Sequence, residues 1–550
     1  MANLSQQRRE RMIAFLETLK EQHTDDDSLI ALGEIEKELK SKKYGLVWEE
    51  HEEAVDIQMK TQIPVFTEVK EKEIYADENG AYNFLLEGDN LHSLYLLEKT
   101  HRGKIDVIYI DPPYNTGSKD FVYDDEFVVK EDGFRHSKWL SFMAERLRIA
   151  KKLISNNGFI FISIDDSEVA QLKLLCNEII GENNFRGQIV RGTGTPTGQG
   201  NAIISNEIDY ILVYAISNTA FFNGLPFDDK SSKIYNLEDE YGHYLLRPLR
   251  KTGGEDKRED RPTMYYPVFA PDGTEVFPVA PSGYDSRWRC QESTYLKLEK
   301  EHRIEWKKDK SGWKVYQKFY LEGRTKQAGN LWTDIEGNKK ATIIVKNIFG
   351  ENVFSFPKPV ELISRILQIA GNKNSIILDF FAGSGTTGQA VMELNKQDGG
   401  NRRFILCTNN ENNICEEVTY QRLKTVITGK RANGSEYSEG IPANLKYFKT
   451  DFVDKDSEEL SDELLEHIAE MIELEHGIKI DNKKYVMIFT DEEMDEFERN
   501  ITSYTDLKAV FVNQDILLSA TQQKLLDSLS SYVIPDYYFD FELREAGELW

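Results

Sequence analysis

The sequence has few cysteines and no long apolar segment. Only four cysteines occur among 550 residues, none of them in a C-x-x-C pair, and no histidine cluster accompanies them. This pattern excludes a disulfide framework and does not indicate a zinc site, so we predict no metal centre and a reducing, cytoplasmic location. No run of about 18 apolar residues exists, and the N-terminal stretch MANLSQQRRERM lacks an apolar region, so we expect neither a membrane span nor a secretory signal.

An excess of positive charge is also missing. The formal net charge is −26, which by itself argues against a nucleic-acid ligand. The acidic residues are concentrated at the ends, however: residues 451–550 contain 26 acidic and 8 basic residues, and residues 1–80 contain 19 and 11. Residues 81–450 hold 49 of each, and their 221–350 section holds 23 basic and 20 acidic residues. The middle of the chain therefore remains free to meet a phosphate backbone.

A chain of this length is too long for one hydrophobic core, and its composition changes several times. Apolar strand-like runs alternate with amphipathic segments before and after a section rich in Gly, Pro, Trp and Tyr. The alternation predicts a mostly parallel, doubly wound α/β sheet. The predicted segments are a helical N-terminal arm, solvated or in contact with a second subunit (1–80), a first α/β part (81–220), a β-rich insertion (221–345), a second α/β part (346–450) and a small acidic C-terminal domain (451–550).

The stretch IDVIYIDPPYNTG (residues 105–117) combines a strand with an unusual ending. Its apolar residues predict a buried strand over 105–110, and Asp111-Pro112-Pro113-Tyr114 ends that strand because proline lacks the N–H of a sheet ladder. Ligands of doubly wound sheets bind at the carboxyl ends of the strands. We therefore expect Asp111 to face a ligand.

The residue types of this ending suit an amino group on a planar substrate. Such an amino group is a poor nucleophile on a nucleobase, because its lone pair is delocalised into the ring. The Asp111 carboxylate and a backbone carbonyl fixed by the two prolines can accept its two N–H bonds and favour the charge that develops as it attacks a methyl sulfonium. Tyr114 offers a face on which an extruded base can stack. A plain Asp-Pro turn with Tyr114 as a packing residue is the alternative.

A second motif, SIILDFFAGSGTTGQAV (residues 375–391), predicts a strand, a glycine turn and a helix. Gly383, Gly385 and Gly388 spell G-x-G-x-x-G, which lets the backbone approach a ligand at a helix N-terminus. A nicotinamide site would have an acid about 20 residues further on, where this chain has RRFILCT and no acid until Glu411. Asp379 is better placed to meet an amine such as that of a methionine moiety. We favour S-adenosylmethionine, with a nicotinamide or a purely structural turn as alternatives.

The two motifs lie 268 positions apart, from Asp111 to Asp379, with DPPY first. In this order they resemble the amino-group DNA methyltransferases whose catalytic motif precedes the recognition region and the cofactor motif. With GDNLHSLYLL, IDYILVYA and IFGENVFSFPKPVELI, the chain most resembles the modification subunit of type III restriction–modification systems. The resemblance covers roughly residues 80–450. The two terminal regions fit by position only.

The resemblance implies a fold and an activity. The fold is a Rossmann-like methyltransferase sheet with permuted motif order and a target-recognition domain at 221–345. The activity is transfer of a methyl group from S-adenosylmethionine to adenine N6 in duplex DNA after base flipping, since cytosine-N4 enzymes usually begin the catalytic motif with Ser. The implied partners are double-stranded DNA, a second copy of the chain and a helicase–nuclease restriction subunit.

The resemblance also implies site residues. The catalytic residues are Asp111, Pro112, Pro113 and Tyr114, and the cofactor-binding residues are Asp89, Asn115, Lys358, Asp379, Phe380, Phe381, Ala382, Gly383, Ser384, Gly385, Thr386, Thr387 and Glu411. One position departs from the family pattern. Relatives often have an acid for the ribose at the end of the strand FILCT, where this chain has Thr408 and then Asn409-Asn410-Glu411, so Glu411 is the candidate.

Three alternative functions remain open at this stage. The chain can be a solitary methyltransferase without a nuclease partner, a DNA-specificity module that lacks catalysis, or a nicotinamide oxidoreductase. The Gly/Thr-rich segment 191–205 is long for a loop, and we expect it to be mobile without DNA and to lie near the flipped base.

Overall fold

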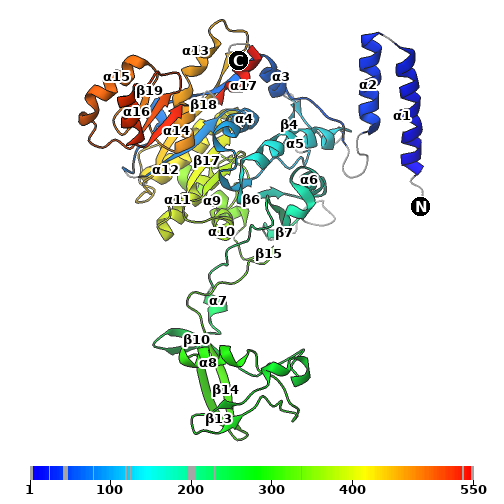
Figure 1. Cartoon of the computed structure of the whole chain (residues 1–550), viewed down its shortest axis with the longest axis vertical. Coiled ribbons are helices and arrows are strands. Elements are labelled where there is room, and N and C mark those ends of the chain that lie inside the picture. Colours follow the sequence, from blue (N-terminus) through cyan, green and yellow to red (C-terminus); the bar gives the residue numbers. More distant parts are fainter. Residues whose placement is uncertain are drawn as a thin grey trace. The chain divides into compact units, whose positions relative to one another are not determined.

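The computed structural model of the chain divides into two compact units (Figure 1). The first comprises Met1–Phe221 and Gly329–Trp550, and the second comprises Phe222–Ala328. The residues described are 4–23, 25–40, 48–78, 80–117, 121–123, 126–129, 132–194, 206–227, 229–335, 337–534 and 538–546. Most of the segment 191–205 therefore lies outside the described residues.

A ten-stranded mixed sheet forms the centre of the first unit. From one edge to the other, its strands are β1 (Gln62–Glu68), β18 (Asn444–Asp454), β2 (Tyr82–Glu87), β17 (Arg403–Thr408), β16 (Ile376–Asp379), β3 (Ile105–Ile110), β6 (Ile154–Ile164), β8 (Ile208–Ala215), β7 (Phe185–Gly192) and β15 (Leu331–Trp332). The six strands from β18 to β6 run parallel, while β1 and β8 pair antiparallel with their neighbours. The predicted mostly parallel α/β sheet is confirmed.

Helices cover both faces of the parallel strands, which explains why these strands are apolar along almost their whole length. α4 (Asn90–His101) joins β2 to β3, α5 (Arg135–Leu153) joins β3 to β6, and α11 (Thr386–Asp398) joins β16 to β17. The first two connections step across the sheet in one direction and the third steps in the other. Because such crossovers are right-handed, α4 and α5 lie on the face opposite α11.

Further helices pack beside these. α6 (Val169–Cys176) contacts α5, α10 (Val360–Ala370) and α12 (Gln421–Thr428) contact α11, and α9 (Asn338–Phe349) contacts α12. A short hairpin of β4 (Val122–Tyr123) and β5 (Glu126–Phe127) precedes α5. The 3-10 turn η6 (Glu411–Asn413) and the π-helix η7 (Ile414–Tyr420) lead from β17 into α12.

The direction of winding reverses between β16 and β3. These two strands are parallel neighbours, with Ile377 opposite Val107 and Leu378 opposite Ile108. In an open α/β sheet, the place where the winding reverses opens a crevice at the carboxyl ends of the strands. The last residue of β16 is Asp379 and the first residue beyond β3 is Asp111. The fold thus brings the two motifs to one edge.

The second unit is mainly antiparallel. Its sheet has the order β13 (Ile304–Asp309), β14 (Gly312–Tyr320), β10 (Gly242–Pro248) and β9 (Leu237–Asp239), and its other elements are α7 (Asp229–Ser232), β11 (Val268–Phe269), β12 (Glu275–Val276) and α8 (Glu292–Lys300). A small core forms around Trp288, Tyr266 and Leu249. This unit is shorter than the predicted insertion 221–345, because β15 and α9 belong to the first unit.

The terminal regions contain further helices and a second small sheet. The N-terminal ones are α1 (Leu4–Gln22), α2 (Asp26–Lys40) and α3 (Ala54–Thr61). After β18 follow α13 (Leu460–Leu465), α14 (Ile468–His476), β19 (Tyr485–Ile488), α15 (Asp491–Asn500), β20 (Ala509–Asn513), α16 (Ala520–Asp527), β21 (Ser531–Ile534) and α17 (Asp540–Ala546). The strands β19, β20 and β21 form a parallel sheet. Within the described residues, no helix is long and apolar enough to span a membrane.

A buried ion cluster connects the C-terminal region to the central sheet. Lys446 on β18 is fully buried, and its ammonium donates to Glu68 on β1 at 2.7 Å and to Glu473 on α14. A buried charge is tolerated only when it is paired. The ion pair between Lys446 and Glu473 therefore holds α14 against β18. The acidic C-terminal part is therefore attached to the central sheet through charge as well as through apolar contacts.

Candidate active site

Asp111 and Tyr114 meet at the end of β3. The Tyr114 hydroxyl donates to Asp111 Oδ1 at 2.9 Å, and the Lys358 ammonium donates to the same oxygen at 2.6 Å. The ammonium also donates to the Tyr114 hydroxyl at 2.7 Å. The three groups therefore form one closed triangle, although Lys358, which precedes α10, lies 244 positions after Tyr114 in the sequence.

The two prolines are fixed by the layer of α5. The indole N–H of Trp139, a fully buried side chain, donates to the Pro113 carbonyl at 2.7 Å. Since Pro113 accepts from the protein, the Pro112 carbonyl is the better candidate for a second acceptor toward a ligand. The sequence predicted a fixed carbonyl here but gave no indication of the tryptophan that fixes the chain.

The glycine turn after β16 closes around a buried carboxyl group. Asp379 accepts from the Phe381 backbone N–H at 3.0 Å and from the Thr387 hydroxyl at 2.5 Å. Burial, with a smaller contribution from the nearby Asp111 charge, raises the pKa of Asp379 to about 7. The carboxyl group thus fixes the turn from inside and lies close enough to Asp111 for the two to interact electrostatically.

Gly383 and Gly385 are glycines because the turn requires it. Both have positive φ angles, 49° and 77°. A Cβ atom on Gly383 would come within 3.1 Å of the Phe354 ring, and one on Gly385 within 3.2 Å of Thr419. Gly388 has a different role: its Cβ would come within 2.5 Å of Leu423, so it permits close packing of α11. Of the three glycines, only the first two have a backbone conformation that disfavours any side chain.

Arg422 supports the turn from behind. It is fully buried on α12 and donates to the Ser384 hydroxyl at 2.9 Å, the Thr386 hydroxyl at 2.8 Å and the Gln389 side chain at 2.8 Å. Burial lowers the pKa of Arg422 to about 10. Sequence analysis missed this residue. The available signal was an arginine on the apolar face of the segment TYQRLKTVI, next to Leu423 and Val426.

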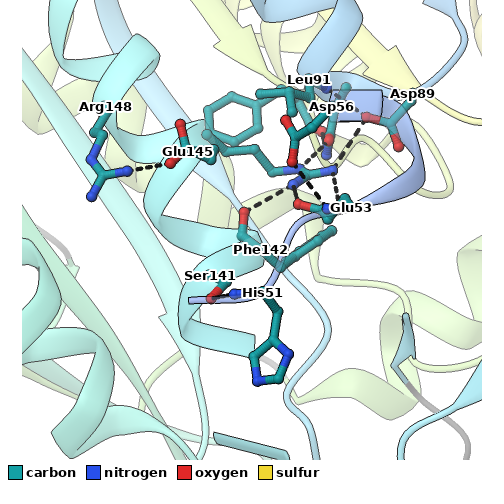
Figure 2. A network of polar contacts seen from close by, with 12 residues as sticks. His51, Glu53, Asp56, Asp89, Leu91, Ser141, Phe142, Glu145 and Arg148 are labelled. Carbon is teal, nitrogen blue, oxygen red and sulfur yellow. Dashed lines mark hydrogen bonds and ion pairs between the residues drawn. The ribbon is translucent and has the colours of Figure 1, made fainter. Parts of the chain in front are cut away.

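Asp89 belongs to a network around a second buried arginine (Figure 2). The guanidinium of Arg146 donates to both oxygens of Glu53, at 2.6 and 3.1 Å, and to Asp89 at 3.2 Å. It also donates to Asn90, whose amide donates to the Phe380 carbonyl at 2.8 Å. The network thus ties the ends of β2 and β16 to α5. Arg146 lies three residues after buried Met143, a position that marked it as a charge on an apolar face.

Asn115 faces away from the Asp111 triangle into a buried polar group. Its side-chain amide donates to Glu168 at 2.6 Å and to the Arg135 carbonyl at 3.1 Å, and its φ angle is 58°. Glu168 is fully buried and also contacts His136 Nδ1 at 2.6 Å. Asn115 Oδ1 and Glu168 Oε2 are buried without a hydrogen-bond partner in the described part of the chain. These contacts do not bring Asn115 to the other predicted cofactor residues.

Glu411 is exposed in η6, beyond the end of β17. The strand itself ends beside β2, where the Thr408 carbonyl accepts from the Gly88 backbone N–H at 3.1 Å. Apart from Asn115 and Glu411, the predicted residues therefore fall into three groups: the strand end at Asp111 with Lys358, the glycine turn with Asp379, and Asp89, which is linked to Phe380 through Asn90. The role of Glu411 in ribose binding stays a prediction.

The fold and the site define a doubly wound α/β enzyme in which an acid–proline–aromatic strand end and a glycine turn share one sheet edge. The chain belongs to the DNA methylase family, which matches residues 105–420. This confirms the resemblance inferred from the two motifs.

Three curated relatives illustrate the range of this similarity. The chain is 33% identical over 395 residues to the type III restriction-modification enzyme StyLTI Mod subunit of Salmonella typhimurium strain LT2, covering 65% of this chain and 59% of that protein. It is 34% identical to the EcoPI Mod subunit of Escherichia phage P1, covering 61% and 58%. It is 37% identical to the type II methyltransferase M.KpnI of Klebsiella pneumoniae, covering 66% and 90%. The chain thus spans less than two thirds of either Mod subunit.

The buried Glu168 predicts a pH-dependent stability. Burial raises its pKa to about 8, so the folded state keeps a proton that the unfolded chain releases near its ordinary pKa. The stabilisation is complete below the ordinary pKa and is lost as the pH rises through about 8. Relative to Glu168→Gln, we expect the wild-type free energy of unfolding to fall by up to about 1.4 kcal/mol per pH unit over this range.

Urea unfolding of both proteins at several pH values between 5 and about 9 measures this difference. Equal pH slopes for wild type and Glu168→Gln would contradict the assignment. Burial also lowers the pKa of His136. Above its ordinary pKa the imidazole is therefore neutral and supplies no positive charge that would favour ionised Glu168.

Proposed function

We propose that the chain is a site-specific DNA methyltransferase that transfers a methyl group from S-adenosylmethionine to adenine N6 in duplex DNA. The observation that supports this most directly is the parallel pairing of β3 with β16, which puts Asp111 and the glycine turn at one edge. A site for two ligands that exchange a group needs both to be held next to each other.

The residues of the glycine turn fit the methyl donor. Gly383 and Gly385 let the turn pass close to Phe354 and Thr419, where a Cβ atom would come within 3.1 or 3.2 Å, and Asp379 fixes the turn by accepting from the Phe381 backbone N–H. S-adenosylmethionine supplies a methyl group on a sulfonium, which a weak nucleophile can attack. Asp89, Phe380, Phe381, Ala382, Ser384, Thr386 and Thr387 are proposed to line the same site, since they stand in the turn or are linked to it.

Asp111 and the residues that follow it bind the adenine amino group, which accepts the methyl group. The Asp111 carboxylate and the Pro112 carbonyl accept the two N–H bonds of the adenine amino group, and Tyr114 stacks on the flipped base. The N6–C bond forms while the C–S bond breaks with its electron pair remaining on sulfur, and a proton of the methylated amino group then leaves to solvent. Asp111 mainly orients the nitrogen and stabilises its developing charge.

The catalytic assignment is tested with Asp111→Ala. We expect methyl transfer to fall by about 10²- to 10³-fold, because the acceptor for the amino group is removed, while S-adenosylmethionine still binds. Incorporation of tritiated methyl groups into duplex DNA and equilibrium cofactor binding measure the two effects. Asp166→Asn, which changes an exposed acid beyond the neighbouring strand β6, serves as the control.

Retained transfer by Asp111→Ala would contradict the catalytic role. Cofactor binding by the wild type without transfer to any duplex would instead favour the catalytically silent specificity module. Methylation-aware sequencing of DNA from cells that express the chain would identify the base and the recognition sequence together.

The second unit is proposed to contact DNA. Its residues 222–328 contain 20 basic and 18 acidic residues in a chain that is otherwise strongly acidic. The guanidinium groups of Arg247 and Arg324 lie 5.3 and 4.6 Å from the centre of the Phe319 ring, and both arginines are exposed. A guanidinium held on an aromatic ring keeps its donors available for a phosphate oxygen.

Arg247→Ala/Arg324→Ala is therefore expected to weaken binding to a mixed-sequence duplex. The slope of log K against log salt should become shallower by about 1 to 2, because up to two phosphate contacts are lost. Fluorescence anisotropy at several salt concentrations measures both quantities, and Lys297→Ala on α8 serves as the control. An unchanged slope would place the DNA on another surface.

We further propose that the chain is the modification and specificity subunit of a type III complex and works in the cytoplasm as a homodimer with a helicase–nuclease subunit. The identity to two Mod subunits supports this. A solitary methyltransferase is the second candidate, since the chain covers 90% of M.KpnI but under two thirds of the Mod subunits.

Affinity purification of the tagged chain from its native cells separates these two candidates. In the first case, a stoichiometric ATP-dependent nuclease is expected to copurify with a dimer of the chain. A chain that methylates DNA and copurifies with no nuclease at low salt would support the solitary enzyme instead.

A further inference from the structure

Lys358 occupies an unexpected position for a residue assigned by resemblance to the cofactor site. Its ammonium contacts Asp111 Oδ1 at 2.6 Å and the Tyr114 hydroxyl at 2.7 Å, and it lies 4.8 Å from the centre of the Tyr114 ring. The side chain is 8% exposed, compared with 26% for Asp111. The lysine therefore approaches the catalytic strand end from the protein side.

The position of Lys358 is fixed by the helix that begins two residues later. Pro359 is the N-cap of α10, and the helix begins at Val360. Six of the eleven residues of α10 are buried, and the helix contacts β3 and β6. Because α10 packs directly on the strand that ends in Asp111, the start of α10 and the end of β3 form one rigid support.

The two carboxylate oxygens of Asp111 have different hydrogen-bond partners. Tyr114 and Lys358 both donate to Oδ1, and no group in the described part of the chain donates to Oδ2. A carboxylate with both donors on one oxygen is fixed in its rotation about the Cβ–Cγ bond. The other oxygen is then presented in a defined direction, as an acceptor for an amino group must be.

We propose that Lys358 is a positioning residue for methyl transfer: its ammonium locks the Asp111 carboxylate and the Tyr114 ring into one unit and directs Oδ2 to the target amino group. This inference rests on the proposed function and adds a residue to it. The ammonium acts through Asp111 and Tyr114 and need not touch the base or the methyl donor.

Lys358→Met tests this role. It replaces the ammonium by a side chain of similar length without charge. We expect kcat to fall by about 10- to 10²-fold, the size of effect that follows from a misplaced reactive group. Kd for S-adenosylmethionine should stay within about threefold, since the lysine does not hold the cofactor. Lys346→Met, on the exposed side of α9, serves as the matched control.

Two further measurements separate positioning from general packing. In a Tyr114→Phe background, Lys358→Met should lower kcat less than in the wild type, because the unit is already broken. In Lys358→Ala, propylamine should restore part of kcat and propan-1-ol should not, because only the amine returns the ammonium. Lys358→Arg should restore little, since a planar guanidinium cannot reproduce both short contacts.

The outcomes are distinct. A Lys358→Met enzyme with wild-type kcat overturns the inference, and so does a large rise in Kd for S-adenosylmethionine with kcat unchanged at saturation, which would return Lys358 to the cofactor site. Loss of kcat that propylamine does not restore assigns the effect to packing and overturns it as well. A wild-type chain that transfers no methyl group overturns the proposed function first, and this inference with it.

Discussion

The pairing of β3 with β16 is the constraint on which the site depends. The two strands come from different parts of the chain; β16 ends in Asp379, and Asp111 directly follows β3. Side by side, they place Asp111 and Asp379 within electrostatic range, and burial raises the pKa of the latter. The hydrogen bonds between β3 and β16 therefore fix the distance between Asp111 and the glycine turn.

Buried cations fix the side chains and the turn that follow these strands. Arg146 joins the ends of β2 and β16 to α5, Arg422 braces the glycine turn, and Lys358 orients Asp111. Each is paired with carboxylates or neutral acceptors, so its burial is compensated and its removal would leave those partners unsatisfied. The carboxyl edge of the sheet is therefore held rigid by buried cations that lie on or next to the helices behind it.

The sequence predicted the parts of this site that are local. Hydrophobic runs located β3 and β16, and the residues that end them identified Asp111 and the turn at Gly383. It could not supply the partners of Lys358 or Asn115, because those contacts join positions far apart in the chain. The sheet was also larger than the alternation of segments indicated: β1 comes from the region predicted as a helical arm, and its pairing with β18 depends on register, which no local pattern encodes.

The order of strands in the sheet sets an order of events during synthesis. β2 is made early, yet its two neighbours, β17 and β18, are among the last strands of the sheet to leave the ribosome. Until residue 408 has emerged, β2 has no partner on either side, and it lacks its second neighbour, β18, until residue 454 has emerged. A chain that stops before β17 would therefore leave the apolar strand β2 without a hydrogen-bonded neighbour, which favours aggregation over folding of the sheet.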